Sequence, residues 1–405
     1  MTRTVRTLVV AGHGMAGHRL VAELRGLDAA GAWRVVVLGE EPHPAYDRVA
    51  LSSYLDGRSA ADLALAGPGS HDPLLELRLN TGVAAVDRAA HTVTTTAGDV
   101  VAYDALVLAT GSRPFVPPVP GHDLPGCFGY RSLGDLDAIR AAAVPGRPGV
   151  VIGGGLLGLE AANALRLLGM EPHVVELAPR LMPLQVDAAG GGVLGLRVAR
   201  RGLRIHCGVA TAAITAGPDG RVASVVLADG SSLAADVVVF SAGVRPRDEL
   251  AGPAGLARGE RGGFLVDELC RTQDERIWAI GECAAVSGRC HGLAAPGYRM
   301  AASVARQLLG LGGEPFGEAD LSTKLKLLGV EVASFGDAHA AAAGAVELSR
   351  LDEAAGTYAK LVLDADCRTL LGGILVGDAR AYGELRPYVG LGLPAAGHRL
   401  LAGTA

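Results

Sequence analysis

The sequence predicts an α/β protein in which two parallel β-sheets are followed by a small α+β domain. Two segments share one pattern, an apolar strand followed by a glycine-rich turn and an amphipathic helix, and they begin near Leu8 and Gly149. Strands that alternate with helices favour parallel sheets. The last part of the chain, from Phe316 to about Tyr388, instead shows strand-like runs separated by turns. A length of 405 residues exceeds one ordinary core and agrees with two or three domains.

Composition and charge exclude several classes of function. Hydrophobic residues make up 49% of the chain and charged residues 20%, and the net charge is −5, which is typical of a soluble globular protein. No basic block points to nucleic acid, and no run of about eighteen apolar residues points to a membrane span. The N-terminus runs directly into a strand-like stretch and shows no signal peptide. With six dispersed cysteines, these features predict a cytoplasmic protein without a membrane or nucleic-acid partner.

The first glycine-rich turn has the pattern of a dinucleotide-binding fingerprint. It reads Gly12-His13-Gly14-Met15-Ala16-Gly17, between a strand and a helix. The first glycine permits the tight turn, the second lets the backbone approach a pyrophosphate, and the third lets the helix pack on the strand. The helix N-terminus offers amide N–H groups and a partial positive charge. Glu40 follows the next strand at a separation of 40 − 17 = 23, close to the expected twenty or so, and its carboxylate would bind ribose hydroxyls. The plain alternative for Glu40 is a surface carboxylate in a turn.

The second turn follows the same logic. It reads Gly153-Gly154-Gly155-Leu156-Leu157-Gly158, and Glu176 ends the next strand at a separation of 176 − 158 = 18. A carboxylate there predicts a preference for NADH over NADPH, because the 2′-phosphate of NADPH would face a negative charge. We expect about a tenfold difference in affinity or more. Arg180 lies four residues further on and would offset part of the repulsion.

Two further segments identify a family. The chain passes between its two glycine-turn domains at Ala109-Thr110-Gly111-Ser112-Arg113-Pro114, and a later segment runs from Thr272 through Ile277 to Gly281-Glu282-Cys283-Ala284. With the two glycine turns, these segments resemble the four ordered motifs of the two-dinucleotide-binding-domain flavoprotein reductases. In that family an acid after the glycine of the last motif binds the ribityl chain of FAD. Most members carry Asp there, whereas this chain has Glu282.

Other segments narrow the resemblance. Residues 40–54, 292–298, 322–337 and 371–378 are similar to the N-terminal part of the large subunit of assimilatory NAD(P)H nitrite reductase. The similarity runs to about Tyr388. Those enzymes continue with Cys-rich iron–sulfur segments and a sirohaem half, so we expect that this chain does not reduce nitrite by itself. Ferredoxin and rubredoxin reductases are related alternatives.

The resemblance implies two Rossmann-like domains that bind FAD and NAD(P)H, followed by the small α+β domain. The cofactors implied are FAD and NADH, with NADPH as the alternative. A Pro-rich crossing from Arg113 to Pro120 and a second crossing at Gly243-Val244-Arg245-Pro246 mark the boundaries. The implied domains are an FAD-binding domain at 1–112 and 246–315, an NAD(P)H-binding domain at 113–245, a C-terminal interface domain at 316–390 and a tail at 391–405.

The resemblance also implies residues at the reacting centre. Arg48 resembles an arginine beside the flavin, and Glu160 resembles the acid that touches the nicotinamide amide. Pro296 would open a helix over 298–309 whose N-terminus points at the flavin pyrimidine. The plain alternatives are a helix-surface carboxylate for Glu160 and an ordinary helix start for Pro296. The cofactor-binding residues expected in all are Gly12, Gly14, Met15, Ala16, Gly17, Glu40, Arg48, Ala109, Thr110, Gly111, Gly153, Gly155, Leu156, Leu157, Gly158, Glu176, Gly243, Gly281, Glu282 and Pro296.

The cysteine positions indicate how electrons would leave the flavin, through a thiol relay or directly. Disulfide reductases of this fold carry a redox cysteine pair after the first ribose acid, and this chain has none between Pro42 and Leu51. Cys207 stands alone, and Cys283 and Cys290 have no common metal-ligand spacing, so we expect no metal site. Electrons should pass directly to a separate iron–sulfur or haem protein, in nitrate or nitrite assimilation, from a monomer or homodimer. The alternatives are a ferredoxin or rubredoxin reductase of a monooxygenase system, a flavin oxidase or tailoring enzyme, and a flavin-binding regulatory protein with little turnover.

Overall fold

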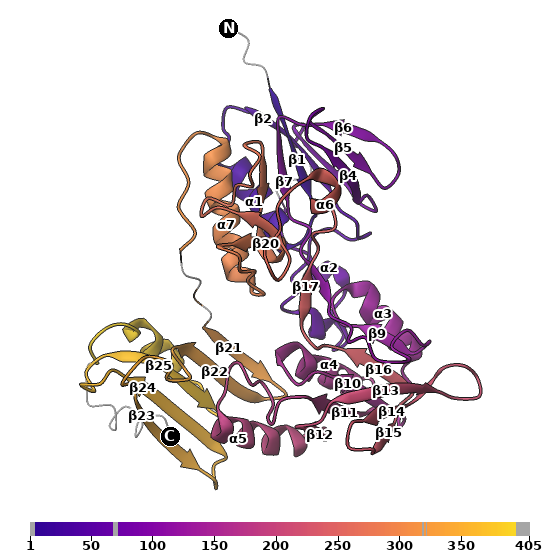
Figure 1. Cartoon of the computed structure of the whole chain (residues 1–405), viewed down its shortest axis with the longest axis vertical. Helices are drawn as coiled ribbons and strands as arrows, with labels where there is room; N and C mark the ends of the chain where they lie inside the picture. Colours follow the sequence, from indigo (N-terminus) through magenta and orange to yellow (C-terminus); the bar gives the residue numbers. More distant parts are fainter. Residues whose placement is uncertain (1–4, 68–71, 318–319, 321, 394–405) are drawn as a thin grey trace. The chain divides into compact units, whose positions relative to one another are not determined.

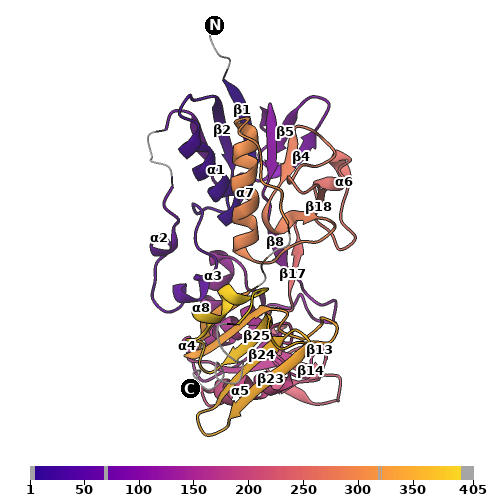
Figure 2. The same cartoon turned by 90° about the vertical axis from the view of Figure 1, so that its left-hand side faces the viewer.

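The computed structural model describes residues 5–67, 72–317, 320 and 322–393. Its internal contacts divide the chain into two compact units, one formed by Met1–Arg113 with Val244–Ala319 and the other by Pro114–Gly243 with Asp320–Ala405. The element labels are those of Figures 1 and 2. Because the C-terminal sheet groups with the second glycine-turn segment, the separate C-terminal domain stays a prediction.

The first unit contains a five-stranded parallel sheet. Ala11 pairs with Leu38 on one side and with Leu108 on the other, so the sheet reaches its carboxyl edge where the first glycine turn begins. Helices α1 (Met15–Leu27) and α7 (Ala294–Leu308) lie side by side along the sheet (Figures 1 and 2). In order across the sheet, the strands are β19 (Ile277–Ala279), β7 (Ala105–Leu108), β1 (Arg6–Ala11), β2 (Trp33–Leu38) and β3 (Leu75–Arg78).

Smaller elements complete this unit. An antiparallel meander is formed by β4 (Val83–Asp87), β5 (Thr92–Thr95) and β6 (Val100–Ala102), and β18 (Phe264–Val266) pairs with β20 (Ala284–Val286). Strands β8 (Ser112–Pro114) and β17 (Val244–Pro246) pair where the chain passes between the units. The short helices are η1 (Leu51–Tyr54), α2 (Ala60–Leu63), α6 (Ala251–Ala254) and η2 (Gly281–Cys283).

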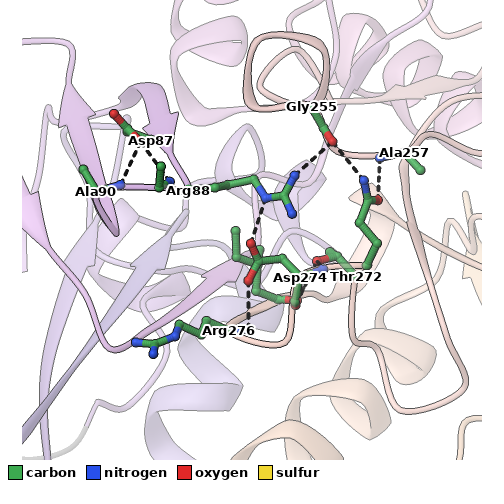
Figure 3. Close-up of polar contacts among 11 residues, drawn as sticks. Asp87, Arg88, Ala90, Gly255, Ala257, Thr272, Asp274 and Arg276 are labelled. Carbon is green, nitrogen blue, oxygen red and sulfur yellow. Dashed lines mark hydrogen bonds and ion pairs between the residues drawn. The ribbon is translucent and has the colours of Figure 1, made fainter.

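A polar cluster fixes the segment that leads into β19 (Figure 3). The Arg88 guanidinium, just after β4, donates from Nε to Asp274 Oδ2 at 2.7 Å and from Nη1 to the Gly255 carbonyl at 3.2 Å. Asp274 also accepts from the Arg276 amide at 3.0 Å. The cluster ties the meander to the segment before β19.

The second unit contains another five-stranded parallel sheet. Ile152 pairs with Val175 and with Phe240, which repeats the central position of β1 in the first sheet. The strands in order are β12 (Arg204–Cys207), β11 (Glu171–Glu176), β10 (Pro148–Ile152), β16 (Val237–Phe240) and β9 (Cys127–Gly129). The helices are α3 (Leu133–Ala142), α4 (Leu156–Leu167) and α5 (Ala188–Ala199), and a meander is formed by β13 (Thr211–Ala216), β14 (Val222–Leu227) and β15 (Ser232–Ala234).

The C-terminal part forms an antiparallel five-stranded sheet with its own apolar core around Phe335, Leu361 and Leu375. The described residues after Gly390 are bound to it, because the Leu393 amide donates to the Arg368 carbonyl at 3.0 Å. Residues 394–405 of the predicted tail lie outside the described part of the chain. The elements in sheet order are β21 (Thr323–Leu327), β22 (Val330–Gly336), β25 (Leu370–Val376), β24 (Thr357–Leu363) and β23 (Val346–Asp352), followed along the chain by α8 (Tyr382–Leu385) and η3 (Arg386–Tyr388).

Three helices begin earlier than the sequence suggests. Helix α1 begins at Met15 and α4 at Leu156, inside the glycine-rich segments 12–17 and 153–158 after which the helices were expected. Helix α7 begins at Ala294, so Pro296 lies inside its first turn and the expectation that Pro296 opens it is wrong. Glycine and proline are tolerated in a first turn because the amide N–H groups there have no partner within the helix. Within the described residues, no helix has the length and apolar composition needed to cross a bilayer.

Candidate functional site

The first glycine turn is closed by two contacts that only glycine allows. Gly12 has φ +114°, and a Cβ built on it would lie 2.2 Å from the Ala109 carbonyl oxygen. A Cβ on Gly17 would lie 2.3 Å from the Gly12 carbonyl oxygen, so the helix packs directly on the turn. A Cβ on Gly14 meets nothing within 4 Å. The turn is therefore compact on its strand side and open where a ligand would approach.

The second glycine turn repeats this construction. Gly153 has φ +115°, and its added Cβ would lie 2.3 Å from the Ser241 carbonyl oxygen. An added Cβ on Gly158 would lie 1.9 Å from the Gly153 carbonyl oxygen, while one on Gly155 meets nothing within 4 Å. Both units thus hold the same turn at the carboxyl edge of the middle strand of a parallel sheet, where such folds bind ligands.

The helices that follow the turns have free N-terminal amides. Helix α1 starts directly after Gly14 and α4 directly after Gly155, and neither has a side-chain cap or an acidic residue in its first turn. The first turns consist of Met15, Ala16 and Gly17 in one unit, and of Leu156, Leu157 and Gly158 in the other. Unpaired amides and the positive end of the helix dipole favour an anionic group. The two turns therefore fit the diphosphates of two dinucleotides.

The two predicted ribose acids lie in different surroundings. Glu40 forms an ion pair with Arg247, and this contact lowers the pKa of Glu40. Glu176 accepts from the Gly154 amide at 2.6 Å and from the Ala178 amide at 2.7 Å. Glu176 is thus fixed beside the second glycine turn.

Arg180 does not face the predicted 2′-position as a free charge. Its Nε donates to the Val186 carbonyl at 2.9 Å and its Nη2 donates to the Pro183 carbonyl at 3.4 Å. Its aliphatic stem lies against Gly191 in α5, where an added Cβ would come within 2.9 Å of the Arg180 Cβ. The guanidinium therefore braces its own loop.

The predicted crossing turn packs against the first glycine turn. The Ala109 amide donates to the Ala11 carbonyl at 2.8 Å, and Gly111 has φ +71°. Thr110 Oγ1 donates to the Arg247 carbonyl at 2.5 Å, and the Arg247 amide donates to the Gly111 carbonyl at 2.9 Å. Arg247 thus holds the crossing turn with its backbone and Glu40 with its side chain.

Sequence reasoning named Gly243 as a cofactor-binding residue and as the start of the second crossing, but it missed that the preceding residues repeat this turn in the second unit. Ser241-Ala242-Gly243 follows β16 and closes the second glycine turn as Ala109-Thr110-Gly111 closes the first. Gly243 has φ +102°, and its carbonyl accepts from the Phe115 amide at 2.9 Å. The signal was available, because two small residues followed by glycine come after an apolar strand in both places.

The second FAD-type motif lies against the starts of α1 and α7. Gly281 has φ +76°, and its added Cβ would be 3.0 Å from the Ala16 Cβ. An added Cβ on Gly297 would be 3.2 Å from the Gly281 Cα. Glu282 accepts from Ser112 Oγ at 2.9 Å, and Pro296 is buried in the first turn of α7. The structure thus brings Ala16, Gly281 and the start of α7 together, while the ribityl role of Glu282 stays a prediction.

Arg48 belongs to a three-residue cluster that the sequence did not reveal. Its guanidinium forms an ion pair with Glu41 and donates to the Tyr46 hydroxyl at 2.8 Å. The Tyr46 hydroxyl donates to Glu41 Oε2 at 2.7 Å, and the guanidinium carbon lies 4.7 Å from the centre of the Tyr46 ring. The cluster keeps the positive charge of Arg48 at a fixed place, and its position beside the flavin stays a prediction.

Glu160 is the unusual acid of the second unit. It lies in α4 just after the glycine turn, it is half-buried, and burial raises its pKa to about 7. The nearby Tyr130 follows β9, and its buried hydroxyl has no hydrogen-bond partner in the described part of the chain. Burial, and then the charge of Glu160, raise the pKa of Tyr130. Tyr130 was missed because its burial and its proximity to Glu160 appear only in three dimensions.

The described part of the chain contains neither a disulfide nor a cluster of metal ligands. All six cysteines are free thiols. Residues 5–67, 72–317, 320 and 322–393 contain no group of three or more His, Cys, Asp or Glu side chains that could hold a metal ion. Cys283 is buried, and burial raises the pKa of the Cys290 thiol to about 11. Neither thiol is a reactive thiolate near neutral pH.

Comparison with known proteins agrees with this geometry. Residues 6–307 match the pyridine nucleotide-disulphide oxidoreductase family, and residues 322–390 match the rubredoxin NAD+ reductase C-terminal domain. The chain is 50% identical over 397 residues to the large subunit of nitrite reductase [NAD(P)H] from Klebsiella oxytoca. The match covers 97% of this chain but 41% of that protein. The chain thus spans less than half the length of this relative.

Two other proteins match along most of their length. The rubredoxin-NAD(+) reductase of Alcanivorax borkumensis is 32% identical, over 92% of this chain and 95% of that protein. The crystal structure of the ferredoxin reductase for the CYP199A2 system from Rhodopseudomonas palustris is 29% identical. It superimposes with a TM-score of 0.84, over 99% of this chain and all of the other. The resemblance to nitrite, rubredoxin and ferredoxin reductases is therefore confirmed, as is the fold with two nucleotide-binding segments and a C-terminal sheet.

The family binds FAD and NAD(P)H, and both glycine turns have the open, uncapped helix ends that these cofactors require. The chain therefore belongs to the pyridine nucleotide-disulphide oxidoreductase family.

Proposed function

We propose that this chain takes a hydride from NADH and passes the electrons, through FAD, to a separate iron–sulfur or haem protein in nitrate or nitrite assimilation. The similarity to the Klebsiella nitrite reductase subunit supports the pathway. The six free cysteines and the raised thiol pKa of Cys290 support a direct transfer without a thiol relay. The protein would work as a monomer or a homodimer.

The observation that carries this proposal is the duplicated glycine turn. Gly12 and Gly153 have almost the same φ, and Gly17 and Gly158 make the same close contact with the first glycine of their turns. One dinucleotide needs one such turn. A chain with two of them is built for two dinucleotides, which suits transfer between cofactors.

The chain supplies binding and orientation, and the flavin supplies the redox chemistry. When bound, FAD would supply two-electron oxidation of NADH and transfer of single electrons to the acceptor. The first turn of α1 would hold the FAD diphosphate and Glu40 its adenosine ribose. The first turn of α4 would hold the NADH diphosphate, with Glu176 on the ribose and Glu160 at the nicotinamide amide. Arg48, Gly281, Glu282 and the start of α7 would surround the remaining part of FAD.

NADH is the proposed donor because the Glu176 carboxylate and the Arg180 guanidinium, the two charges expected near the adenosine ribose, are both held by backbone groups. Glu176 is held by two backbone amides, and Arg180 is bound to backbone carbonyls of its own loop. A 2′-phosphate would therefore meet a carboxylate without a neutralising cation from Arg180.

A second candidate is a rubredoxin or ferredoxin reductase. The match of residues 322–390 to the rubredoxin NAD+ reductase C-terminal domain favours it, as does the coverage of the Alcanivorax enzyme over 95% of its length. In that case the acceptor would be a small iron–sulfur protein instead of a nitrite reductase.

Stopped-flow reduction of three acceptors distinguishes these candidates. The FAD-loaded chain is reduced with NADH and mixed with the sirohaem part of a nitrite reductase, a rubredoxin or a [2Fe–2S] ferredoxin. We expect the sirohaem part to be reduced fastest, and faster rubredoxin or ferredoxin reduction would favour the second candidate. Rapid reoxidation by oxygen alone would indicate an oxidase, and no reduction by NADH would leave only a flavin-binding regulatory role.

A further inference from the structure

Helix α5 is attached at its N-terminus to the C-terminal sheet. Asp187 is the N-cap residue of α5 and accepts from the Gly190 amide at 2.9 Å. The same carboxylate accepts from the Tyr358 hydroxyl at 2.7 Å and pairs with Lys360 Nζ at 3.0 Å. Both of these residues lie in β24, beside which α5 packs (Figure 1).

The ammonium group of Lys360 is buried and paired with two carboxylates. Only 3% of the side chain is exposed, and its second partner is Glu347 at 2.9 Å. A buried charge is tolerated when it is paired and hydrogen-bonded, and removing one partner is costly. Lys360 therefore holds Asp187 in one position relative to the sheet.

The other end of α5 is attached as well. Arg197 donates from Nε to the Gly356 carbonyl at 2.6 Å and from Nη2 to the Ala355 carbonyl at 2.7 Å. Gly377 makes room for this guanidinium, since its added Cβ would lie 3.1 Å from Arg197 Nε. The helix is thus fixed at both ends, and it cannot shift along the sheet without breaking charged contacts.

The loop between β11 and α5 is held between these attachments. Glu176 fixes its beginning through the Gly154 and Ala178 amides, and Asp187 fixes its end. A residue of the C-terminal part also reaches its middle, because His339 Nε2 hydrogen-bonds to the Leu184 carbonyl at 2.9 Å. Residues 177–186 therefore have their shape set partly by the C-terminal sheet.

We propose that Lys360, Tyr358 and His339 are positioning residues for the adenylate half of NADH. They act through Asp187 and the 177–186 loop, which follows the ribose acid Glu176, and they touch neither the nicotinamide nor the flavin. This inference rests on the proposed binding of NADH at the second glycine turn. It assigns the C-terminal sheet a part in donor recognition, in addition to any part in docking an electron acceptor.

The test compares two donors in the FAD-loaded full chain. Reduced nicotinamide mononucleotide carries the same reactive ring as NADH but lacks the adenylate half. In Lys360→Met we expect kcat/KM for NADH to fall about tenfold through KM, a change of about 1.4 kcal/mol, because Asp187 and the loop before it would lose a fixed position. The kcat/KM for reduced nicotinamide mononucleotide should stay within about twofold of the wild type.

Two milder variants and one control keep the test decisive if Lys360→Met misfolds. Tyr358→Phe removes one hydrogen bond to Asp187, and His339→Ala removes an exposed contact with Leu184. Each should raise KM for NADH by a smaller factor. Lys326→Met removes an exposed lysine from β21 of the same sheet and should change neither donor.

The outcomes separate this inference from the proposed function. Equal losses with both donors in Tyr358→Phe and His339→Ala, or unchanged KM for NADH in all three variants, would overturn the positioning role. A wild-type chain that oxidises neither donor would instead refute the proposed function.

Discussion

At the scale of single residues, burial moves the pKa of Glu160 into the neutral range. Its pKa rises from 4.5 to about 7 because burial disfavours the carboxylate. A raised pKa means that the folded protein holds a proton that the unfolded chain releases between these pH values. The contribution of Glu160 to stability is thus fully present below pH 4.5 and is lost as the pH rises through 7. The loss is on the order of 3 kcal/mol.

The variant Glu160→Gln should remove this pH dependence. At pH 8 we expect the variant to resist urea better than the wild type, and at pH 4 we expect equal stability. The measurement is the free energy of unfolding in urea across this range. A wild type whose stability does not fall relative to Glu160→Gln between pH 5 and pH 8 would show that the carboxyl is ordinarily solvated.

Glu176 should set the choice of donor. Replacing it in Glu176→Ser removes the charge that we propose would face a 2′-phosphate and leaves a hydroxyl. We expect KM for NADPH to fall and KM for NADH to rise, so that the ratio of the two kcat/KM values changes by about tenfold or more. Steady-state kinetics with both donors measure this ratio. An unchanged ratio would mean that the ribose lies elsewhere.

At the scale of elements, the two glycine turns leave no room for a side chain at their last glycine. A methyl group on Gly158 would overlap the Gly153 carbonyl oxygen, and one on Gly17 would overlap the Gly12 carbonyl oxygen. Gly158→Ala should therefore displace α4 and abolish reduction by NADH while FAD stays bound. Gly17→Ala should displace α1 and lose FAD. Flavin absorbance after gel filtration and NADH-dependent bleaching measure the two effects.

A glycine outside the turns provides the matched control. Gly192 lies in α5, is exposed, and has nothing within 4 Å of an added Cβ. Because alanine favours a helix over glycine, Gly192→Ala should raise the free energy of unfolding by up to about 1 kcal/mol and leave FAD and NADH binding unchanged. If Gly17→Ala and Gly158→Ala behaved like this control, the close contacts would not control cofactor binding.

The elements also show why some of the site could be predicted and some could not. Gly12 and Gly17 lie five residues apart between a strand and a helix, so the local sequence revealed the turn and the helix, while the ribose role of Glu40 stays a prediction. The start of α1 was misplaced because Met15 lies between the glycines of the turn, and glycine disfavours a helix interior. The start of α7 was misplaced because proline breaks a helix in its interior. Both residue types are tolerated in the first turn of a helix. Tyr130 gave no local signal, since only the paired strands bring it near Glu160.

At the scale of the whole molecule, the two parallel sheets follow from the repeated strand–turn–helix pattern, whereas the order of their strands was not predicted and comes from the structure. The attachment of α5 to the C-terminal sheet did not follow, because Tyr358 and Asp187 are 171 positions apart. A lone Asp before a glycine-rich helix and a lone Lys in a strand each have ordinary local explanations. Long-range pairing of this kind becomes visible only when the chain is folded.

The central claim is that two similar turns hold two different dinucleotides in one reductase. An anaerobic titration of the FAD-loaded chain with NADH tests it most directly, with the visible flavin absorbance as the signal. We predict that the absorbance bleaches in proportion to added NADH until one equivalent per flavin has been consumed. A purified chain that takes up no FAD, or a bound flavin that stays oxidised in excess NADH, would contradict the account.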